Sequence, residues 1–228
     1  MREIVLDIET TGLQYKDGDR IIDIACLELS NLIPTGRTYQ TYVNPEGRKV
    51  GKSVEIHNLT DEFLQDKKLF KKVISEFLKF IKNAPLIVHN GLIFDIPFLN
   101  NELKLHKFNI IKNPIIDTVL LARKKFPNSP VNLDALCRRF DIDLFTRKKK
   151  HGASIDTKLL ARVYLELKGG QQPDLNLKKS ISYENKDQNI NYNKKKWEER
   201  IYSLSIEEID KHKKYIKKIK KPLWNIYN

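Results

Sequence analysis

The chain has 228 residues, of which 40% are hydrophobic and 31% charged, and this suits one globular domain with an appendage. No apolar run approaches the roughly 18–20 residues of a membrane span, and the first predicted strand begins too early for a signal peptide, so we expect no membrane partner. The net charge of +13 favours a polyanionic partner such as nucleic acid, although an abundance of Lys, Ile and Asn throughout the chain would explain it equally well.

Three strands are predicted in succession near the N-terminus, because stretches rich in Ile, Val, Thr and Tyr are separated by polar turns. They cover residues 3–9, 20–29 and 36–43. Apolar residues at helical spacing then predict a helix at 69–81. Beyond it we predict a strand at 85–90, a helix at 95–105, a strand or a strand running into a helix at 115–119, and helices at 132–140 and 155–167. Three successive strands followed by this alternation predict an α/β fold with a mixed sheet flanked by helices.

The composition divides the chain into three parts. Residues 1–170 form the predicted compact domain, which ends at a pair of glycines. Residues 171–196 are rich in Asn, Lys, Gln and Ser and predict a flexible linker. Residues 197–228 predict a C-terminal helical segment, because Ser205 and Glu208 match a capping box and a basic helix with a modest apolar stripe follows.

The two cysteines, Cys26 and Cys137, each lie in an apolar periodic segment. We therefore predict reduced thiols in the core of a cytosolic protein. Neither their spacing nor their neighbours indicate a zinc site.

Two carboxylates, Asp7 and Glu9, interrupt the first apolar strand. Alternate residues of a strand point to the same face, so the two side chains converge. Two buried like charges are costly unless a cation neutralises them. A divalent metal ion would do so, and the alternative is a strand end at which Glu9 is simply solvated.

Two other segments supply further acids. Asp95 follows a buried strand and opens a helix, where capping that helix is the alternative role. His151 lies in the loop that enters the helix of Asp156, where a plain surface histidine is the alternative. Asp156 shares the face expected to pack on the core with three apolar residues, Leu160, Val163 and Leu167.

Four carboxylates and one histidine from three segments would then meet at one edge of the sheet. Hard oxygen ligands of this kind select Mg²⁺ or Mn²⁺ rather than zinc. Two such ions about 4 Å apart stabilise the attacking and leaving oxygens of a phosphoryl displacement, and a neutral histidine can take the proton of the attacking water. In a basic chain, this pattern predicts a two-metal nuclease.

The motifs resemble those of a known family. The stretches DIETTG, HNGLIFD and HGASID resemble, in this order, the three exonuclease motifs of the DEDDh group of DnaQ-like exonucleases in the ribonuclease-H-like superfamily. IHNLTDEFL, VNLDALCRRFDID and HGASIDTKLLARVYLELKGGQ further resemble the proofreading epsilon subunits of bacterial DNA polymerase III, so that the resemblance covers roughly residues 2–172. It implies a five-stranded mixed sheet and a metal-dependent 3′-to-5′ exodeoxyribonuclease that releases nucleoside monophosphates within a cytoplasmic, replisome-associated polymerase holoenzyme.

By motif position, the resemblance implies that Asp7, Glu9, Asp95 and Asp156 hold two Mg²⁺ or Mn²⁺ ions and that His151 is the general base. Asp7 would bridge both ions. Glu9 and Asp156 would complete the site that activates water, and Asp95 would serve the second ion. The implied substrate contacts are three of these acids and six further residues: Asp7, Glu9, Asp156, Thr10, Thr11, Gly12, Leu13, His57 and Asn90.

This sequence departs from the family pattern in two places. Five residues separate His89 from Asp95, one more than the family usually has, so we expect the loop between them to bulge. Asn58 stands where a glycine usually follows the substrate-contacting histidine. Neither departure removes a predicted ligand.

The segments after the domain resemble partner-binding segments of the same family. Gln172, Leu175 and Leu177 match the Q-x-x-L-x-L/F peptide that docks on the bacterial sliding clamp. The final segment resembles the part that binds the polymerase III alpha subunit, with the predicted anchors Trp197, Ile209, Ile216, Leu223 and Trp224. A basic tail that touches DNA phosphates is the alternative, and a small accessory subunit is a further candidate partner.

Three functions compete at this point. The first is a proofreading exonuclease subunit that acts on single-stranded or frayed 3′ DNA ends. The second is a DEDDh exoribonuclease that trims RNA 3′ ends, but a free-standing trimmer has no need of a tail with a clamp-like peptide. The third is a non-catalytic replisome adaptor, which the presence of all five reactive residues disfavours. We therefore predict the proofreading exonuclease.

Overall fold

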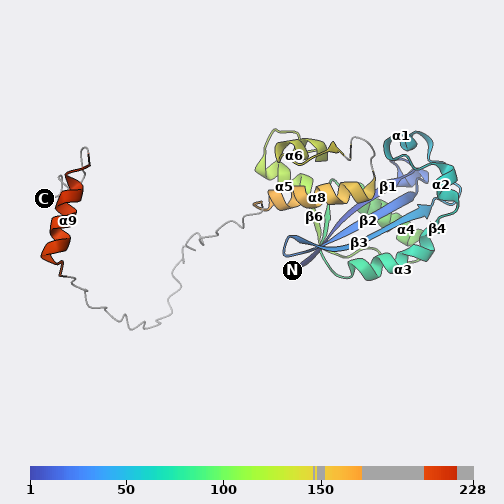
Figure 1. The fold of residues 1–228 in the computed structure, drawn as a ribbon. Helices are drawn as coiled ribbons and strands as arrows, with labels where there is room; N and C mark the ends of the chain where they lie inside the picture. The colour runs from blue at the N-terminus through green and yellow to red at the C-terminus, as the bar shows by residue number, and fades with distance from the viewer. Residues whose placement is uncertain (146, 148–151, 171–202, 220–228) are drawn as a thin grey trace, which may run out of the picture. The chain divides into compact units, whose positions relative to one another are not determined.

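A computed structural model of the chain describes residues 1–145, 147, 152–170 and 203–219 (Figure 1). The chain divides into two compact units, residues 1–177 and 178–228. The first unit contains a sheet with helices on both faces, and the described part of the second contains one helix, α9 (Ile206–Ile216).

The sheet of the first unit has the strand order β4-β3-β2-β1-β5-β6. Its strands are β1 (Arg2–Thr10), β2 (Ile21–Ser30), β3 (Ile33–Asn44), β4 (Lys68–Leu69), β5 (Leu86–Val88) and β6 (Ile115–Asp117). The first three pair antiparallel, whereas β4, β5 and β6 each pair parallel with a neighbour. The predicted mixed sheet is confirmed with one addition, because the two-residue strand β4 makes it six-stranded rather than five-stranded.

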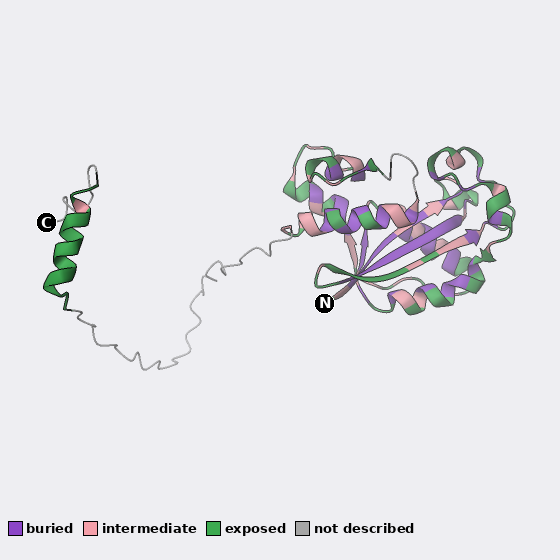
Figure 2. Cartoon of the chain, in the orientation of Figure 1, coloured by how far each residue is buried: buried purple, intermediate pink, exposed green. Residues whose placement is uncertain are grey.

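Helices and short turns surround this sheet: η1 (Tyr15–Asp17), η2 (Gly51–Ser53), α1 (Val54–His57), α2 (Asp61–Gln65), α3 (Phe70–Ile81), α4 (Asp95–Leu105), α5 (Thr118–Lys125), α6 (Leu133–Arg139) and α8 (Ala153–Leu167). The central strands are buried over most of their length (Figure 2). One hydrophobic cluster lies between the sheet and α3 and α4, and another lies between the sheet and α5, α6 and α8.

Strand β1 distributes its side chains between these two clusters. Its even-numbered apolar residues join the cluster of α3 and α4: Ile4, Leu6 and Ile8. Val5 joins the cluster of α8, and because alternate residues share a face, Asp7 and Glu9 lie on the α8 side as well. The Tyr164 hydroxyl of α8 donates a 2.8 Å hydrogen bond to Glu3, which fixes the helix across this face.

The predicted helices of the first unit are confirmed to within two residues. The side chain of Asn132 accepts a 2.8 Å hydrogen bond from the Ala135 amide and so caps α6. Of the two predictions for residues 115–119, the strand that runs into a helix is confirmed, because β6 ends at Asp117 and α5 begins at Thr118. Gly169 and Gly170 follow the last turn of α8 with positive φ angles of 122° and 81°.

Both cysteines are buried free thiols, as predicted. Cys26 lies in the cluster of α3 and α4, and Cys137 lies in the cluster of α8 on the other face of the sheet. The two therefore cannot pair with each other. Burial raises the pKa of the Cys137 thiol to about 11, so it is protonated at neutral pH.

In the second unit, α9 begins with the predicted capping box. The Ser205 hydroxyl accepts a 3.3 Å hydrogen bond from the Glu208 amide, and the Glu208 carboxylate accepts one of 2.9 Å from the Ser205 amide. Ile209 is 40% exposed and Ile216 is half-buried. The other predicted partner contacts lie outside the described residues: Gln172, Leu175, Leu177, Trp197, Leu223 and Trp224. No helix in the described part of the chain is long and apolar enough to cross a membrane.

Candidate active site

Three of the predicted metal ligands meet where α8 crosses β1. Asp7, Glu9 and Asp156 place carboxylate oxygens within 4.8 Å of one another. Asp156 lies in the first turn of α8 and is 7% exposed, and it shares a face with Leu160 and Tyr164, which pack on β1 one and two turns later. The prediction that Asp156 faces the core beside the strand acids is therefore confirmed geometrically.

Asp95 is the first residue of α4 and is 4% exposed. Phe94 occupies the N-cap position, so Asp95 does not cap this helix. Its carboxylate is hydrogen-bonded by the backbone amides of Asp95 and Ile8, which ties α4 to β1. Its charge also reaches Asp7, whose pKa it raises, although Asp95 lies outside the group of three whose oxygens meet within 4.8 Å.

The loop that carries Asp95 is held by the end of β6. The Asp117 carboxylate accepts hydrogen bonds from the amides of Asn90 and Leu92, at 3.0 and 3.2 Å. The chain then turns into α4, which leaves Leu92 and Ile93 43% and 74% exposed. The extra residue of this loop is thus absorbed in an exposed turn, and Asp95 stays buried beside β1.

Residue 91 must be a glycine, because the backbone of this turn lies close to the side chains of Val88 and Asp95. A Cβ at Gly91 would lie 2.5 Å from the Cβ of Val88 and 2.9 Å from Oδ2 of Asp95. We predict that Gly91→Ala displaces the Asp95 carboxylate and lowers the rate of metal-dependent hydrolysis roughly 10- to 100-fold, the usual cost of disturbing the support of a metal ligand. Gly152→Ala is the control, because a Cβ there meets nothing within 4 Å. Equal rates in the two variants would contradict the prediction.

Asp156 has an arginine partner that the sequence did not reveal. Arg147 donates from Nε and Nη2 to the two carboxylate oxygens of Asp156, at 2.7 and 3.0 Å, and its Nη1 contacts Asp134. A metal ion was the only counter-charge predicted for Asp156. Arg147 belongs to the basic run R-K-K-K, and nothing in the sequence marks it as the partner of Asp156.

Burial and the charges of neighbouring carboxylates raise the pKa values of Asp7, Glu9 and Asp95. Burial, followed by the charges of Asp95 and Glu9, raises the pKa of Asp7 well above its ordinary range. Burial, followed by the charge of Asp156, raises the pKa of Glu9 to about 8. Burial raises the pKa of Asp95 to about 7. Arg147 offsets part of the negative charge of these acids, and protons or a metal ion must neutralise the rest. A donor set of carboxylate oxygens suits Mg²⁺ or Mn²⁺.

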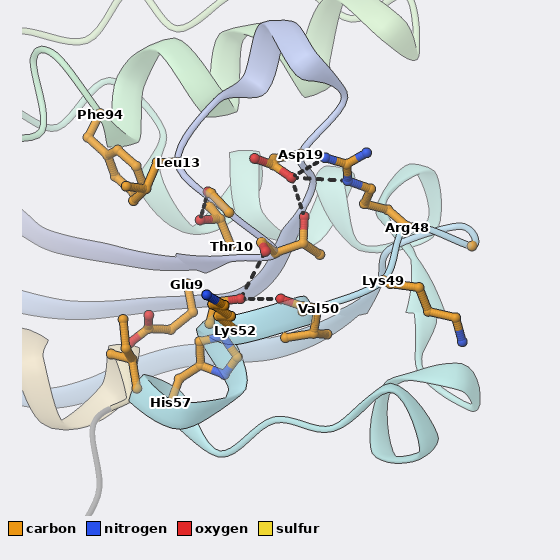
Figure 3. A pocket seen from close by; sticks show the side chains of 16 residues that line it. Glu9, Thr10, Leu13, Asp19, Arg48, Lys49, Val50, Lys52, His57 and Phe94 are labelled. Carbon is orange, nitrogen blue, oxygen red and sulfur yellow. Dashed lines mark hydrogen bonds and ion pairs between the residues drawn. The ribbon is translucent and has the colours of Figure 1, made fainter.

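A cavity of about 710 Å³ adjoins the acidic cluster of Asp7, Glu9 and Asp156, of which Glu9 lines the cavity (Figure 3). Six of the predicted substrate contacts line it: Glu9, Thr10, Thr11, Gly12, Leu13 and His57. Asn90 lines a different hollow of about 490 Å³, together with Arg123 and Arg147. The larger cavity, of about 710 Å³, is also lined by residues that no sequence pattern indicated, including Asp19, Arg48 and Phe94.

His57 presents an unsatisfied nitrogen at this site. The residue is 2% exposed, and its Nδ1 accepts a 3.1 Å hydrogen bond from the Leu59 amide. Burial lowers the pKa of His57, so the ring is neutral and Nε2 carries the proton. Nε2 is buried and makes no hydrogen bond of ordinary geometry among the described residues, and the Thr10 backbone is a polar neighbour that partly offsets the effect of burial on the His57 pKa. Asn58 follows with a left-handed φ of 58°, a conformation that asparagine tolerates in place of glycine.

The predicted general base, His151, lies outside the described residues, so its position stays a prediction.

Comparisons with known proteins agree with this geometry. A family model described as Exonuclease matches residues 4–164. The chain is 43% identical over 226 residues to DNA polymerase III subunit epsilon of Rickettsia felis, covering 97% of this chain and 98% of that protein. It is 39% identical over 178 residues to the Escherichia coli protein of the same name, covering 75% of this chain and 72% of that protein.

Two solved structures show the same fold at lower identity. Exonuclease X in complex with 5′ overhanging duplex DNA matches with a TM-score of 0.56 and 21% identity, covering 72% of this chain and 90% of that chain. The nuclease domain of 3′hExo, a DEDDh family member bound to rAMP, matches with a TM-score of 0.61 and 18% identity, covering 73% and 90%. The chain therefore belongs to the exonuclease family, in its DNA polymerase III epsilon-subunit branch.

Proposed function

We propose that Asp7, Glu9, Asp95 and Asp156 hold the divalent ions with which this chain, a 3′-to-5′ proofreading exonuclease, hydrolyses DNA 3′ ends. The observation that carries the proposal is the meeting of three carboxylates within 4.8 Å beside a cavity of about 710 Å³. Two bound Mg²⁺ or Mn²⁺ ions would supply the neutralising charge at the attacking and leaving oxygens of the displacement.

The remaining roles fall to side chains around the cavity. The terminal nucleotide lies against Thr10–Leu13, whose exposed member Leu13 stands beside Phe94 and offers an apolar surface (Figure 3). His57 donates from Nε2 to an oxygen of that nucleotide. His151 takes the proton of the attacking water as general base. Cleavage releases a nucleoside monophosphate and leaves a new 3′ end.

The names of the relatives support a role inside DNA polymerase III. The segment 197–228 would bind the alpha subunit, with Ile209 on α9 among the apolar anchors, and the peptide from Gln172 to Leu177 would bind the sliding clamp. A small accessory subunit would bind the exonuclease domain. Such an assembly works on chromosomal DNA in the bacterial cytoplasm.

Digestion of single-stranded DNA and of RNA of matching sequence tests this function. The purified chain is incubated with each substrate in Mg²⁺, Mn²⁺ or EDTA, beside the Asp7→Ala and His151→Ala variants. We expect metal-dependent release of deoxynucleoside monophosphates from the 3′ end, lost in Asp7→Ala and strongly reduced in His151→Ala. A preference for RNA would identify an RNA-trimming enzyme instead. No hydrolysis of either substrate by the folded, metal-loaded protein would contradict the enzymatic function altogether.

The raised pKa values predict how metal binding depends on pH. A carboxyl group whose pKa rises on folding, such as Glu9 from 4.5 to about 8, stabilises the fold below its ordinary pKa and loses that contribution as pH rises through the folded value. Without divalent metal, stability should therefore fall between pH about 5 and about 8. Mg²⁺ binds the ionised acids, so its stabilising effect should grow over the same range. Thermal unfolding with Mg²⁺ and with EDTA measures this effect, and a Mg²⁺ effect independent of pH would contradict the prediction.

A further inference from the structure

The mechanism leaves Asp19 without a role, although its carboxylate lines the nucleotide cavity (Figure 3). Asp19 lies in the loop between η1 and β2 and is 7% exposed. None of the hydrogen bonds found for it in the described part of the chain reaches the acidic cluster of Asp7, Glu9 and Asp156. A buried carboxylate at this place calls for an explanation, because burial of a charge is costly unless the charge is paired and hydrogen-bonded.

One wall of the cavity is the loop that follows β1, and Asp19 holds this loop at several points. Its Oδ2 accepts a 3.0 Å hydrogen bond from the Gln14 amide, and its Oδ1 accepts one of 3.2 Å from the Thr11 hydroxyl. A Cβ on Gly12 would lie 2.3 Å from Oδ2 of Asp19. The backbone of this wall therefore packs directly on the carboxylate, and glycine is needed for the approach.

Another wall of the cavity is the loop of residues 47–53, which lies between β3 and α1. Arg48 from this loop donates from Nε and Nη2 to Oδ1 of Asp19, at 3.0 and 2.9 Å. The Arg48 side chain is 45% exposed, whereas that of Asp19 is 10% exposed, so the pair is desolvated at its acidic end. A pair of this kind is held more firmly than one between two exposed side chains. The Ser53 hydroxyl lies 2.9 Å from the Thr11 carbonyl and 2.6 Å from the Val50 carbonyl, so its one proton is shared between a link across the two walls and a link within its own segment.

We infer that Asp19 and Arg48 form a positioning pair, which sets the separation of these two walls and so the affinity for the terminal nucleotide. The inference rests on the proposed function, since it assigns the cavity to that nucleotide. The pair acts on binding and leaves the chemical step unchanged, because it fixes the walls and makes no contact with the acids that hold the ions.

Steady-state hydrolysis of single-stranded DNA by the full chain with Mg²⁺ tests the pair. Asp19→Asn and Arg48→Gln should each raise KM roughly 10- to 100-fold, the range expected for the loss of a hydrogen bond to a charged group, with kcat within about 3-fold of wild type. The double variant should be no worse than the worse single variant, because both changes remove the same link. Arg48→Lys keeps the charge and loses the planar fork, so its KM should lie between those of wild type and Arg48→Gln.

Asp17→Asn and Arg37→Gln are matched controls, because both side chains are exposed and neither lines the cavity. In Asp19→Asn and Arg48→Gln, equilibrium dialysis should show that the affinity for deoxythymidine monophosphate falls by the same factor by which KM rises. Circular dichroism checks that each variant is folded. If Asp19→Asn unfolds, Arg48→Gln still tests the inference, because it replaces a half-exposed side chain and should leave the fold intact. Unchanged KM and nucleotide affinity in folded Arg48→Gln, or a loss in kcat alone, would overturn the inference. A wild type that binds the nucleotide without hydrolysing DNA would instead overturn the proposed function.

Discussion

Asp7→Asn should abolish hydrolysis and, in the same protein, raise the melting temperature measured in EDTA. Asp7 is one of the three acids whose oxygens meet within 4.8 Å, so its loss removes a metal ligand. The rate should fall by more than the roughly 10- to 100-fold that loss of a residue supporting a metal ligand costs. Stability should rise because burial and the neighbouring charges of Asp95 and Glu9 oppose ionisation of Asp7, and the amide removes that repulsion.

Two measurements check this pair of effects: the rate of nucleotide release with Mg²⁺ and thermal unfolding by circular dichroism in EDTA. Asp66→Asn serves as the control, because Asp66 is an exposed carboxylate at the end of α2. It should change neither quantity. A variant at Asp7 that keeps its activity within a few-fold, or that melts lower than wild type in EDTA, would show that the acids are not held together for a cation.

His151→Gln should lower kcat by about 10²- to 10⁴-fold, the usual contribution of a general base, without weakening metal binding. This combination separates the proposed proton acceptor from the proposed ligands, since Asp7→Asn loses both properties. The rate of single-stranded DNA hydrolysis gives kcat, and the rise in melting temperature on adding Mg²⁺ measures whether the ions still bind. Added imidazole should restore part of the rate to His151→Ala. A variant that loses the Mg²⁺ effect, or one that keeps the wild-type rate, would contradict the assignment.

Most of the fold could be predicted because its signals are local. The alternation of β1 already separates the side chains that pack under α3 and α4 from the side that carries Asp7 and Glu9. The helical spacing of α8 places Asp156 above that side. Strand β4 was missed because two residues, Lys68 and Leu69, carry no periodicity. They become a strand only by pairing with the end of β3.

The acids of the site could be predicted, whereas the groups that hold them in place could not. Arg147 reaches Asp156 across 9 positions of sequence and Arg48 reaches Asp19 across 29, and the chain offers 42 basic residues for such pairings. Which of them turns inward depends on tertiary packing. Asp117 likewise accepts hydrogen bonds from the loop before α4 only because β5 and β6 pair side by side.

A calorimetric titration of Mn²⁺ into the wild type and Asp7→Asn at constant pH shows whether Asp7, Glu9 and Asp156 bind a metal ion. We expect the wild type to bind Mn²⁺ with release of protons, because the pKa of Glu9 is about 8 and this carboxyl group is largely protonated at neutral pH before the ion enters. We expect Asp7→Asn to lose most of this binding while it stays folded. Equal Mn²⁺ affinity in the two proteins would contradict the claim that Asp7, Glu9 and Asp156 form a metal site.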